Sequence, residues 1–287
     1  MSRLIVPNWV ARHRTLPGNR ASCARLRPKL AKFRSDAPVV SIVIPAYNEE
    51  QTLLQTLSSL ADQQTQVPTE LIVANNNSSD RTQEILDACG VKSLFVRTQG
   101  VAHARQAGLE AAKGQLVASA DADCLYPTGW VDAITRPLLR PSVSCTYGLY
   151  SFIPSEHSSR LALELYETLS HTANWLRNIN KAYLNVYGFN FAFRRGDAID
   201  VGGFALDTGR EGSLAELAAE GKLPPPSGRC EDGWMALSLV QAGKGTICRV
   251  TDADAHVWTS DRRLIADGSL GKAFTNRLRG YLGVNAS

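Results

Sequence analysis

The stretch that decides the fold is residues 115–123, QLVASADAD, in which an apolar run ends directly at two aspartates. Residues 115–120 have the length and composition of a buried strand, and Asp121 and Asp123 follow with one residue between them. In a doubly wound sheet, ligands bind at the carboxyl ends of the strands. The two carboxylates are therefore predicted to line a ligand crevice, where their oxygens suit Mg²⁺ or Mn²⁺ together with a diphosphate.

Three apolar runs precede this stretch and alternate with helical patterns. The predicted strands are 39–45, 70–74 and 93–96, and the predicted helices are 49–61, the segment around Ile85 and Leu86, and 101–112. This order predicts a three-layer α/β/α fold around a doubly wound, mostly parallel sheet.

Charge is unevenly distributed along the chain. Residues 1–35 contain nine Lys or Arg and no acid, whereas the net charge of all 287 residues is only +4. Three interpretations of this segment stay open. It is a solvated or locally folded extension, or an arm that lies on an anionic membrane surface through Ile5, Val6 and Trp9, or a nucleic-acid-binding arm. Nucleic acid is the least favoured of these partners.

The chain carries no pattern of a membrane span or of a structural metal site. No run approaches the roughly 20 apolar residues that cross a bilayer. The six cysteines are scattered without a CxxC pair, and no hydrophobic signal segment opens the sequence. We therefore expect a cytoplasmic protein with reduced thiols, peripheral on the inner face of the membrane if the basic arm binds lipid.

Six motifs occur in an order typical of the family 2 glycosyltransferases, which the sequence resembles from about Val39 to Arg263. They are SIVIPAYNEE (41–50), ELIVANNNSSDRT (70–82), GVAHARQAG (100–108), DAD (121–123), GFNFAFRR with VGGF (188–204), and ED (231–232). The resemblance implies a nucleotide-diphospho-sugar transferase (GT-A) fold. It also implies a metal-dependent, inverting transfer of a sugar from a nucleotide diphosphate to an acceptor, with Mn²⁺ or Mg²⁺ as cofactor.

The same resemblance divides the chain. Residues 1–37 are the basic extension, 38–263 the glycosyltransferase domain and 264–287 a C-terminal tail. Within the domain, 38–123 is the nucleotide-binding half and 124–263 the acceptor half.

Particular residues receive roles from the resemblance. Asp123 and Asp121 are expected to hold the metal, and Asp121 also to reach the donor. His256 is a candidate third ligand, because a nitrogen arriving from the C-terminal side would complete the shell. Asp232 is the candidate general base, because the attacking hydroxyl must lose its proton. The nucleotide and its diphosphate are expected to be lined by Pro45, Ala46, Tyr47, Glu49, Asn76, Arg105, Arg262 and Arg263.

The residues alone leave other roles open. Asp232 has the position of a helix N-cap, and Arg105 fits a solvated helix face. A lone histidine such as His256 is more often structural. Arg262 and Arg263 also suit a solvated pair at a helix start.

Three departures from the family pattern bear on specificity. Asn75 and Asn76 stand where acids are common in the family. A UDP-sugar is the favoured sugar donor. An amide side chain, however, both donates and accepts hydrogen bonds and so fits more than one nucleotide base. The Gln-x-x-Arg-Trp signature of processive synthases is missing, so we expect a single transfer to a glycan or a lipid-linked sugar. The insertion between Phe204 and Glu231 is either an acceptor lid or a long loop.

Two other classes of protein share features with this sequence. A nucleotidyltransferase shares the general fold, but it should open with a glycine-rich basic phosphate loop, which this sequence lacks. A non-catalytic glycan-binding or scaffolding protein at a membrane surface stays open, because the presence of Asp123 and Asp232 does not establish turnover.

Overall fold

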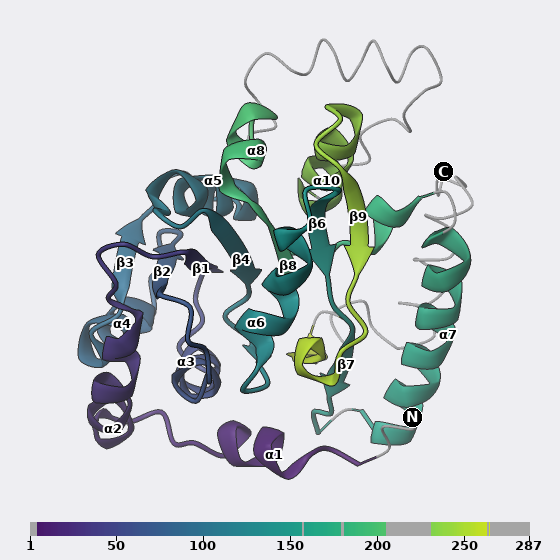
Figure 1. Ribbon diagram of the computed structural model, residues 1–287. Helices are drawn as coiled ribbons and strands as arrows, with labels where there is room; N and C mark the ends of the chain where they lie inside the picture. The colour runs from purple at the N-terminus through teal and green to yellow at the C-terminus, as the bar shows by residue number, and fades with distance from the viewer. Residues whose placement is uncertain (1–4, 157, 179–180, 205–230, 263, 265–287) are drawn as a thin grey trace.

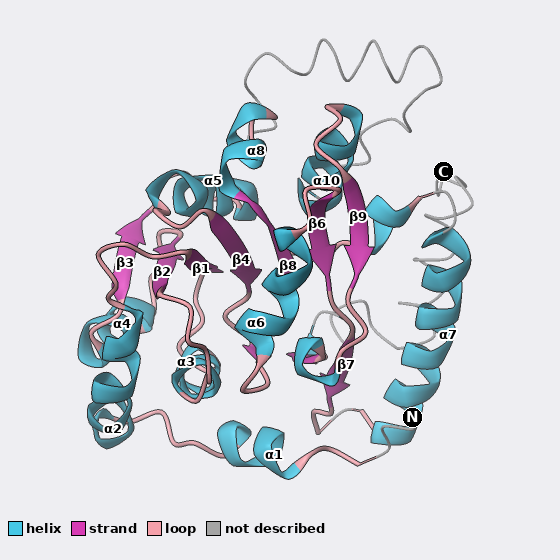
Figure 2. Cartoon of the chain, viewed as in Figure 1, coloured by secondary structure: helices cyan, strands magenta, loops and turns pink. Residues whose placement is uncertain are grey.

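A seven-stranded sheet forms the centre of the molecule in the computed structural model, which describes residues 5–156, 158–178, 181–204, 231–262 and 264 (Figure 1, Figure 2). The strand order is β3-β2-β1-β4-β8-β6-β9. In chain order these strands are β1 (Val40–Ala46), β2 (Thr69–Asn75), β3 (Lys92–Phe95), β4 (Leu116–Ala120), β6 (Val143–Tyr147), β8 (Asn190–Arg194) and β9 (Thr246–Arg249).

Strand direction makes this sheet mostly parallel. Its neighbouring strands pair in parallel except around β8, which runs antiparallel to both β4 and β6. A smaller sheet in the order β5-β10-β7 joins β5 (Cys124–Leu125), β10 (Val257–Ser260) and β7 (Tyr150–Ile153). The predicted α/β fold is confirmed, and the small sheet brings the segment after Asp123 beside the C-terminal part of the domain.

Helices cover both faces of the main sheet. Along β1, Ile42 and Ile44 belong to the core on one face and Val43 to the core on the other, because successive side chains of a strand point to opposite sides. The face of Ile42 and Ile44 is covered by α3 (Leu53–Ala61), α4 (Thr82–Cys89) and α6 (Trp130–Thr135). The face of Val43 is covered by α5 (Val101–Ala111), α8 (Arg195–Asp200) and α10 (Glu231–Gln241). The long helix α7 (Arg160–Asn178) packs beside β7.

The basic N-terminal segment is folded against the domain. Its helices α1 (Asn8–Arg14) and α2 (Arg20–Leu30) pack on α3 and α4. Val6 and Trp9 pack on the cluster of Val10, Leu125 and Trp258, whereas Ile5 is 84% exposed. Of the three apolar side chains expected at a lipid surface, Val6 and Trp9 thus pack against the protein core.

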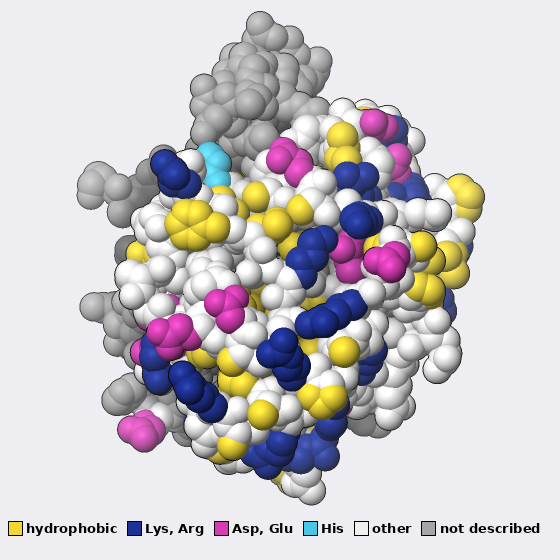
Figure 3. Space-filling view, turned by 90° about the vertical axis from the view of Figure 1, so that its left-hand side faces the viewer, with side chains coloured by type: hydrophobic (Ala, Val, Ile, Leu, Met, Phe, Trp, Pro, Cys, Tyr) yellow, Lys and Arg dark blue, Asp and Glu magenta, His cyan; other side chains and the backbone are white. Residues whose placement is uncertain are grey.

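The cations of this segment remain on the surface. Figure 3 shows Lys and Arg side chains in a band across the face where α2 and α4 lie. The exposed members within residues 12–34 are Arg12, Arg14, Arg20, Arg25, Arg27, Lys29, Lys32 and Arg34. Only one nearby acid, Asp62, pairs with two of them, Arg12 and Lys29, among the described residues.

One predicted helix begins later than its pattern indicated. The expected helix 49–61 starts at Leu53, because the preceding residues contact the loop after β2. The backbone N–H of Glu49 donates to Thr82 Oγ1 at 2.9 Å, and that of Glu50 to Asp80 Oδ2 at 3.0 Å. The insertion 205–230, Arg263 and the tail from 265 onward lie outside the described residues.

Candidate active site

A cavity of about 290 Å³ opens where β1, β2 and β4 end. Such a place is the usual ligand crevice of an open α/β sheet. The cavity is lined by Pro45, Ala46, Tyr47, Glu49, Asn76, Gln99, Gly100, Val101, Ala104, Asp121, Ala122 and Asp123. The structure therefore brings the expected residues of the first strand and loop together with Asn76 and both aspartates of the DAD motif.

Two loops that form one wall of the cavity hold each other in place. Asn48 adopts a positive φ of 53° and Asn77 one of 58°, a conformation that asparagine tolerates better than most residues. The backbone N–H of Asn48 donates to Ser78 Oγ at 3.0 Å, and that of Ser79 donates to Asn48 Oδ1 at 2.9 Å. The asparagine-rich sequence thus fixes the ends of β1 and β2 relative to each other.

The Asn76 side chain is committed to the loop that follows β3. Its Nδ2 donates to the carbonyl oxygens of Val96, at 3.2 Å, and Thr98, at 2.7 Å. Its Oδ1 accepts from the backbone N–H of Gly100 at 2.8 Å. Both amide hydrogens are thereby used inside the protein, and only Oδ1 keeps a free lone pair. Toward a ligand in the cavity, Asn76 has acceptor capacity and no donor.

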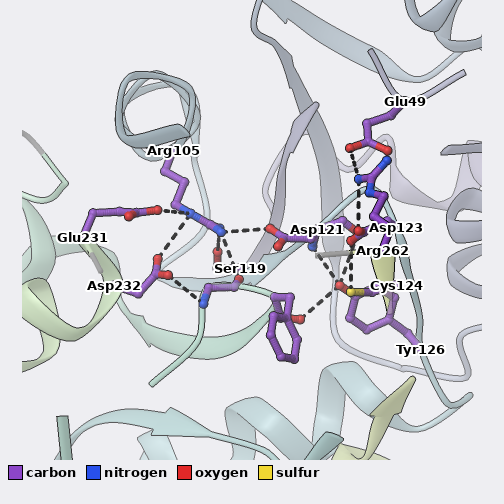
Figure 4. A network of polar contacts seen from close by, with 12 residues as sticks. Glu49, Arg105, Ser119, Asp121, Asp123, Cys124, Tyr126, Glu231, Asp232 and Arg262 are labelled. Carbon is purple, nitrogen blue, oxygen red and sulfur yellow. Dashed lines mark hydrogen bonds and ion pairs between the residues drawn. The ribbon is translucent and has the colours of Figure 1, made fainter. Parts of the chain in front are cut away.

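Arg105 lies behind the cavity at the centre of an acidic cluster (Figure 4). Its guanidinium contacts Asp121 Oδ1 at 2.8 Å, and its Nε lies 3.2 Å from both Glu231 Oε1 and Asp232 Oδ1. It also donates to Ser119 Oγ at 2.7 Å and to the Gly188 carbonyl at 3.2 Å. Arg105 is only 3% exposed. These contacts tie the DAD motif to α10, and Arg105 is absent from the described residues that line the cavity.

Glu231 is a member of this cluster to which the sequence assigned no role of its own. The ED motif (231–232) pointed to Glu231, but only Asp232 received a role from it. The cluster carries one cation against three carboxylates, and a cation so buried requires paired charges. Burial by itself lowers the pKa of Arg105, and the carboxylates of Asp232, Asp121 and Glu231 together raise it above the usual arginine range.

Asp232 is the second residue of α10 and is 6% exposed. Its Oδ2 accepts from the backbone N–H of Gly188 at 2.8 Å, a contact with another segment rather than a cap of its own helix. Its Oδ1 faces Arg105 Nε and accepts no well-formed hydrogen bond among the described residues. Burial raises the pKa of Asp232 to about 7, with Glu231 and Asp121 adding to the rise and Arg105 opposing it. A carboxyl group tuned in this way suits a general base that works near neutral pH.

Gly188 fits closely between the two charged groups. A side-chain carbon built on Gly188 would lie 2.2 Å from Arg105 Nη2. Its N–H donates to Asp232 and its carbonyl accepts from Arg105. Because three carboxylates hold the guanidinium in place, Arg105 has little freedom to make room for a side chain, and the segment before β8 requires glycine here.

A second cation, Arg262, joins the metal motif to the loop after β1. Its Nη2 lies 3.0 Å from Asp123 Oδ2 and also contacts Glu49 Oε1 (Figure 4). The small sheet accounts for this approach, because Thr259 of β10 pairs with Cys124 and the backbone N–H of Ser260 donates to the Asp123 carbonyl at 3.2 Å. The expected partner Arg263 lies outside the described residues.

The structure does not bring His256 to the two aspartates. Its ring is buried, and Nε2 lies 3.0 Å from Ser151 Oγ, which in turn donates to Glu167. His256 precedes Ser260 by four residues of extended chain, which span about 13 Å. The expectation of a third ligand at His256 is therefore corrected, because the register of β10 brings the segment near Ser260 to Asp123.

The carboxylates at the cavity fit a divalent cation that completes its shell with other ligands. Among the residues that the structure describes, no three His, Cys, Asp or Glu side chains gather as a complete metal cage. Asp121 and Asp123 nevertheless both line the cavity, and Asp123 presents Oδ2 to a cationic group. Mg²⁺ and similar ions often take one or two carboxylates and complete their shell with phosphates and water. These two residues fit that kind of site.

Comparison with known proteins identifies the family. The model of glycosyl transferase family 2 matches residues 41–202, more than half of the chain, and the protein belongs to this family. Among curated proteins, it is similar to the UDP-Glc:alpha-D-GlcNAc-diphosphoundecaprenol beta-1,3-glucosyltransferase WfgD of Escherichia coli. The two are 30% identical over 122 residues, which is 41% of this chain and 48% of that enzyme. This chain thus matches about half the length of that relative.

Solved structures share the fold at low sequence identity. Glucosyl-3-phosphoglycerate synthase from Mycobacterium tuberculosis, in complex with Mn²⁺, UDP-glucose and phosphoglyceric acid, is 19% identical with a TM-score of 0.52, covering 92% of this chain and 85% of that one. The mannosyltransferase PcManGT from Pyrobaculum calidifontis, in complex with GDP-mannose and Mn²⁺, is 18% identical with a TM-score of 0.52, covering 94% and 75%. These similarities support the nucleotide-diphospho-sugar transferase fold.

Proposed function

We propose that the protein transfers a sugar, in a metal-dependent and inverting reaction, from a nucleoside diphosphate to an acceptor. The observation that carries this proposal is the continuous chain of contacts from the cavity to the candidate base. Asp121 lines the cavity and pairs with Arg105, which in turn contacts Asp232. Donor-binding and proton-accepting groups are thereby held in one rigid unit.

Asp123 and Asp121 would hold the divalent ion, Mn²⁺ or Mg²⁺. When bound, such an ion stabilises the negative charge that develops on a departing diphosphate. The walls formed by Pro45, Tyr47 and Val101 would enclose the nucleoside, and the half-exposed Tyr47 ring offers a surface for a base to stack on.

Asp232 would accept the proton of the attacking hydroxyl through Oδ1, since Oδ2 is already bonded to Gly188. Asp232 is absent from the lining of the described cavity, so the proposal puts the acceptor beside the nucleoside site, toward Asp232 and α10. Attack on the sugar from the side opposite the diphosphate is a single displacement, and it inverts the anomeric configuration.

The hydrogen bonds of Asn76 restrict which nucleotide base suits the cavity. Because this side chain offers an acceptor and no donor, it suits a base with a ring N–H, such as uracil or guanine, better than cytosine. We propose a UDP-sugar as the donor, with a GDP-sugar as the alternative.

Binding of nucleoside diphosphates tests the proposal directly. A thermal-shift screen of UDP, GDP, dTDP and CDP is run with and without Mn²⁺ on the wild type, Asp123→Ala and the surface control Asp87→Asn. At about 100 times its Kd, the preferred nucleotide is expected to stabilise the wild type by about 2.7 kcal/mol. The metal-dependent part should vanish in Asp123→Ala and persist in Asp87→Asn. If no diphosphate stabilises the wild type, the interpretation as a scaffolding protein replaces the transferase proposal.

A lipid-linked acceptor and peripheral attachment to the inner face of a membrane are part of the proposal. In the described part of the chain, no helix is long and apolar enough to cross a bilayer. The exposed cations of α1 and α2 form a surface suited to anionic headgroups, and the E. coli relative acts on a diphosphoundecaprenol-linked sugar by its name.

Vesicle sedimentation tests the attachment. The protein is expected to pellet with vesicles that contain anionic lipid and to stay in solution with neutral ones. Replacing Arg14, Arg20 and Arg25 by glutamine should weaken binding by about fivefold per residue, since each cation near the surface contributes about 1 kcal/mol. Equal sedimentation with both kinds of vesicle would exclude an electrostatic attachment.

A further inference from the structure

Arg262 contacts Oδ2 of Asp123, an oxygen that the proposed metal site would use. Its Nη2 lies 3.0 Å from Asp123 Oδ2 and also contacts Glu49 Oε1. Both acids line the cavity, so the cation lies between two cavity carboxylates. An arginine at this position and a divalent ion on Asp123 Oδ2 exclude each other sterically and repel each other electrostatically.

The ion pair between Arg262 and Asp123 can break without disturbing the structure around it. Asp123 is 7% exposed at its side chain, whereas Arg262 is 45% exposed and lies two residues beyond Ser260, where β10 ends. Backbone pairing holds Ser260 at Asp123, so the main chain stays close even when the side chain turns away. A long, half-exposed side chain on such an anchor can move to another anion without unfolding the small sheet.

A bound diphosphate would supply that other anion. Arginine binds phosphate oxygens well, through two parallel N–H donors. A diphosphate carries negative charge on both phosphates and offers several oxygens to Arg262, and its oxygens would also complete the shell of a divalent ion on Asp123. Arg262 and the divalent ion would then no longer compete for Oδ2 of Asp123.

We propose that Arg262 is an internal counter-ion of the metal site, which occupies Asp123 until a nucleoside diphosphate arrives and so makes divalent-ion binding depend on the donor. This inference rests on the proposed function. It means that the ion and the diphosphate enter together and that the ion alone binds weakly. An enzyme built in this way does not fill its site with metal in the absence of donor.

Mn²⁺ binding without any donor tests the inference. The signal of free Mn²⁺ is followed by electron paramagnetic resonance as each protein is titrated, first alone and then with the diphosphate found in the thermal-shift screen. Wild type, Arg262→Gln, Arg262→Lys and Arg81→Gln are compared. Arg81 is the matched control, because it pairs with Glu50, the residue after Glu49, and makes no ion pair with Asp123 among the described residues.

Arg262→Gln is expected to bind Mn²⁺ alone at least about tenfold more tightly than the wild type, because a like charge has left the site. Arg262→Lys and Arg81→Gln should stay near the wild type. With diphosphate present, the wild type should gain far more Mn²⁺ affinity than Arg262→Gln does. Equal Mn²⁺ affinity of the wild type and Arg262→Gln without nucleotide would overturn the inference while leaving the transferase proposal intact. Absence of Mn²⁺ binding in every protein, with and without diphosphate, would overturn both.

Discussion

Replacing Asp232 by asparagine is expected to lower kcat by about 10²- to 10⁴-fold, the usual contribution of a positioned general base. Asparagine keeps an oxygen for the Gly188 N–H but cannot take up a proton. Binding of the nucleoside diphosphate and Mn²⁺ should be unchanged, because Asp232 is absent from the cavity lining. Initial rates at saturating donor, together with the thermal-shift response, check both expectations.

The pH dependence gives this experiment a second readout. A base works only when deprotonated, so wild-type activity should rise as pH increases through about 7, the raised pKa of Asp232. Asp232 has its ordinary pKa of 3.8 in the unfolded chain, so the folded state holds the proton more tightly than the unfolded chain does. The contribution of Asp232 to stability therefore falls as pH rises from about 4 to 7. Asp232→Asn should be at least as stable as the wild type at pH 8; a clear loss of stability there would assign the carboxylate a structural role instead.

Replacing Arg105 by glutamine is expected to lower the free energy of unfolding by about 3–5 kcal/mol near neutral pH. Removal of one partner from a buried ion pair leaves uncompensated charge, and here three carboxylates lose their shared cation. Protonation relieves that repulsion, so the loss should be smaller at pH 5 than at pH 8. Urea unfolding of the wild type and the variant at both pH values measures the difference.

Arg81→Gln is the control for the stability of Arg105→Gln. The Arg81 side chain is 65% exposed in its pair with Glu50, so its loss should cost less than about 1 kcal/mol. Arg105→Lys should fall between the wild type and Arg105→Gln, because a lysine keeps the charge but lacks the planar fork that reaches several acceptors. A loss for Arg105→Gln that is equal at pH 5 and pH 8 would show that packing rather than charge explains it.

Sequence patterns were informative where structure depends on near neighbours. The apolar runs before Asn75 and Asp121 predicted strands to within one or two residues, because burial on both faces of a parallel sheet requires continuous apolar residues. The expected gathering of Tyr47, Asn76 and Asp123 at one cavity followed from the same rule, since parallel strands end at a common edge.

The same patterns were less informative for side chains with several available partners. Arg105 was expected at the nucleotide, yet its guanidinium turns to the acids of α10, and Glu231 lies 126 residues away along the chain. Asn76 was left with two hydrogen-bonding roles, and only the loop after β3 showed that its donors are used internally. For the N-terminal segment, a basic composition did not distinguish an exposed arm from helices packed on α3 and α4.

The sequence by itself determined the strand and helix order, the position of two carboxylates after a central strand, and the family to which the chain belongs, because periodicity and motif are local properties. Only the tertiary structure decided which cation meets which carboxylate. Arg262 reaches Asp123 across 139 residues because β10 pairs with β5, and the same register keeps His256 away from the DAD motif. Such pairings depend on strand register between distant segments, which short-range patterns do not specify.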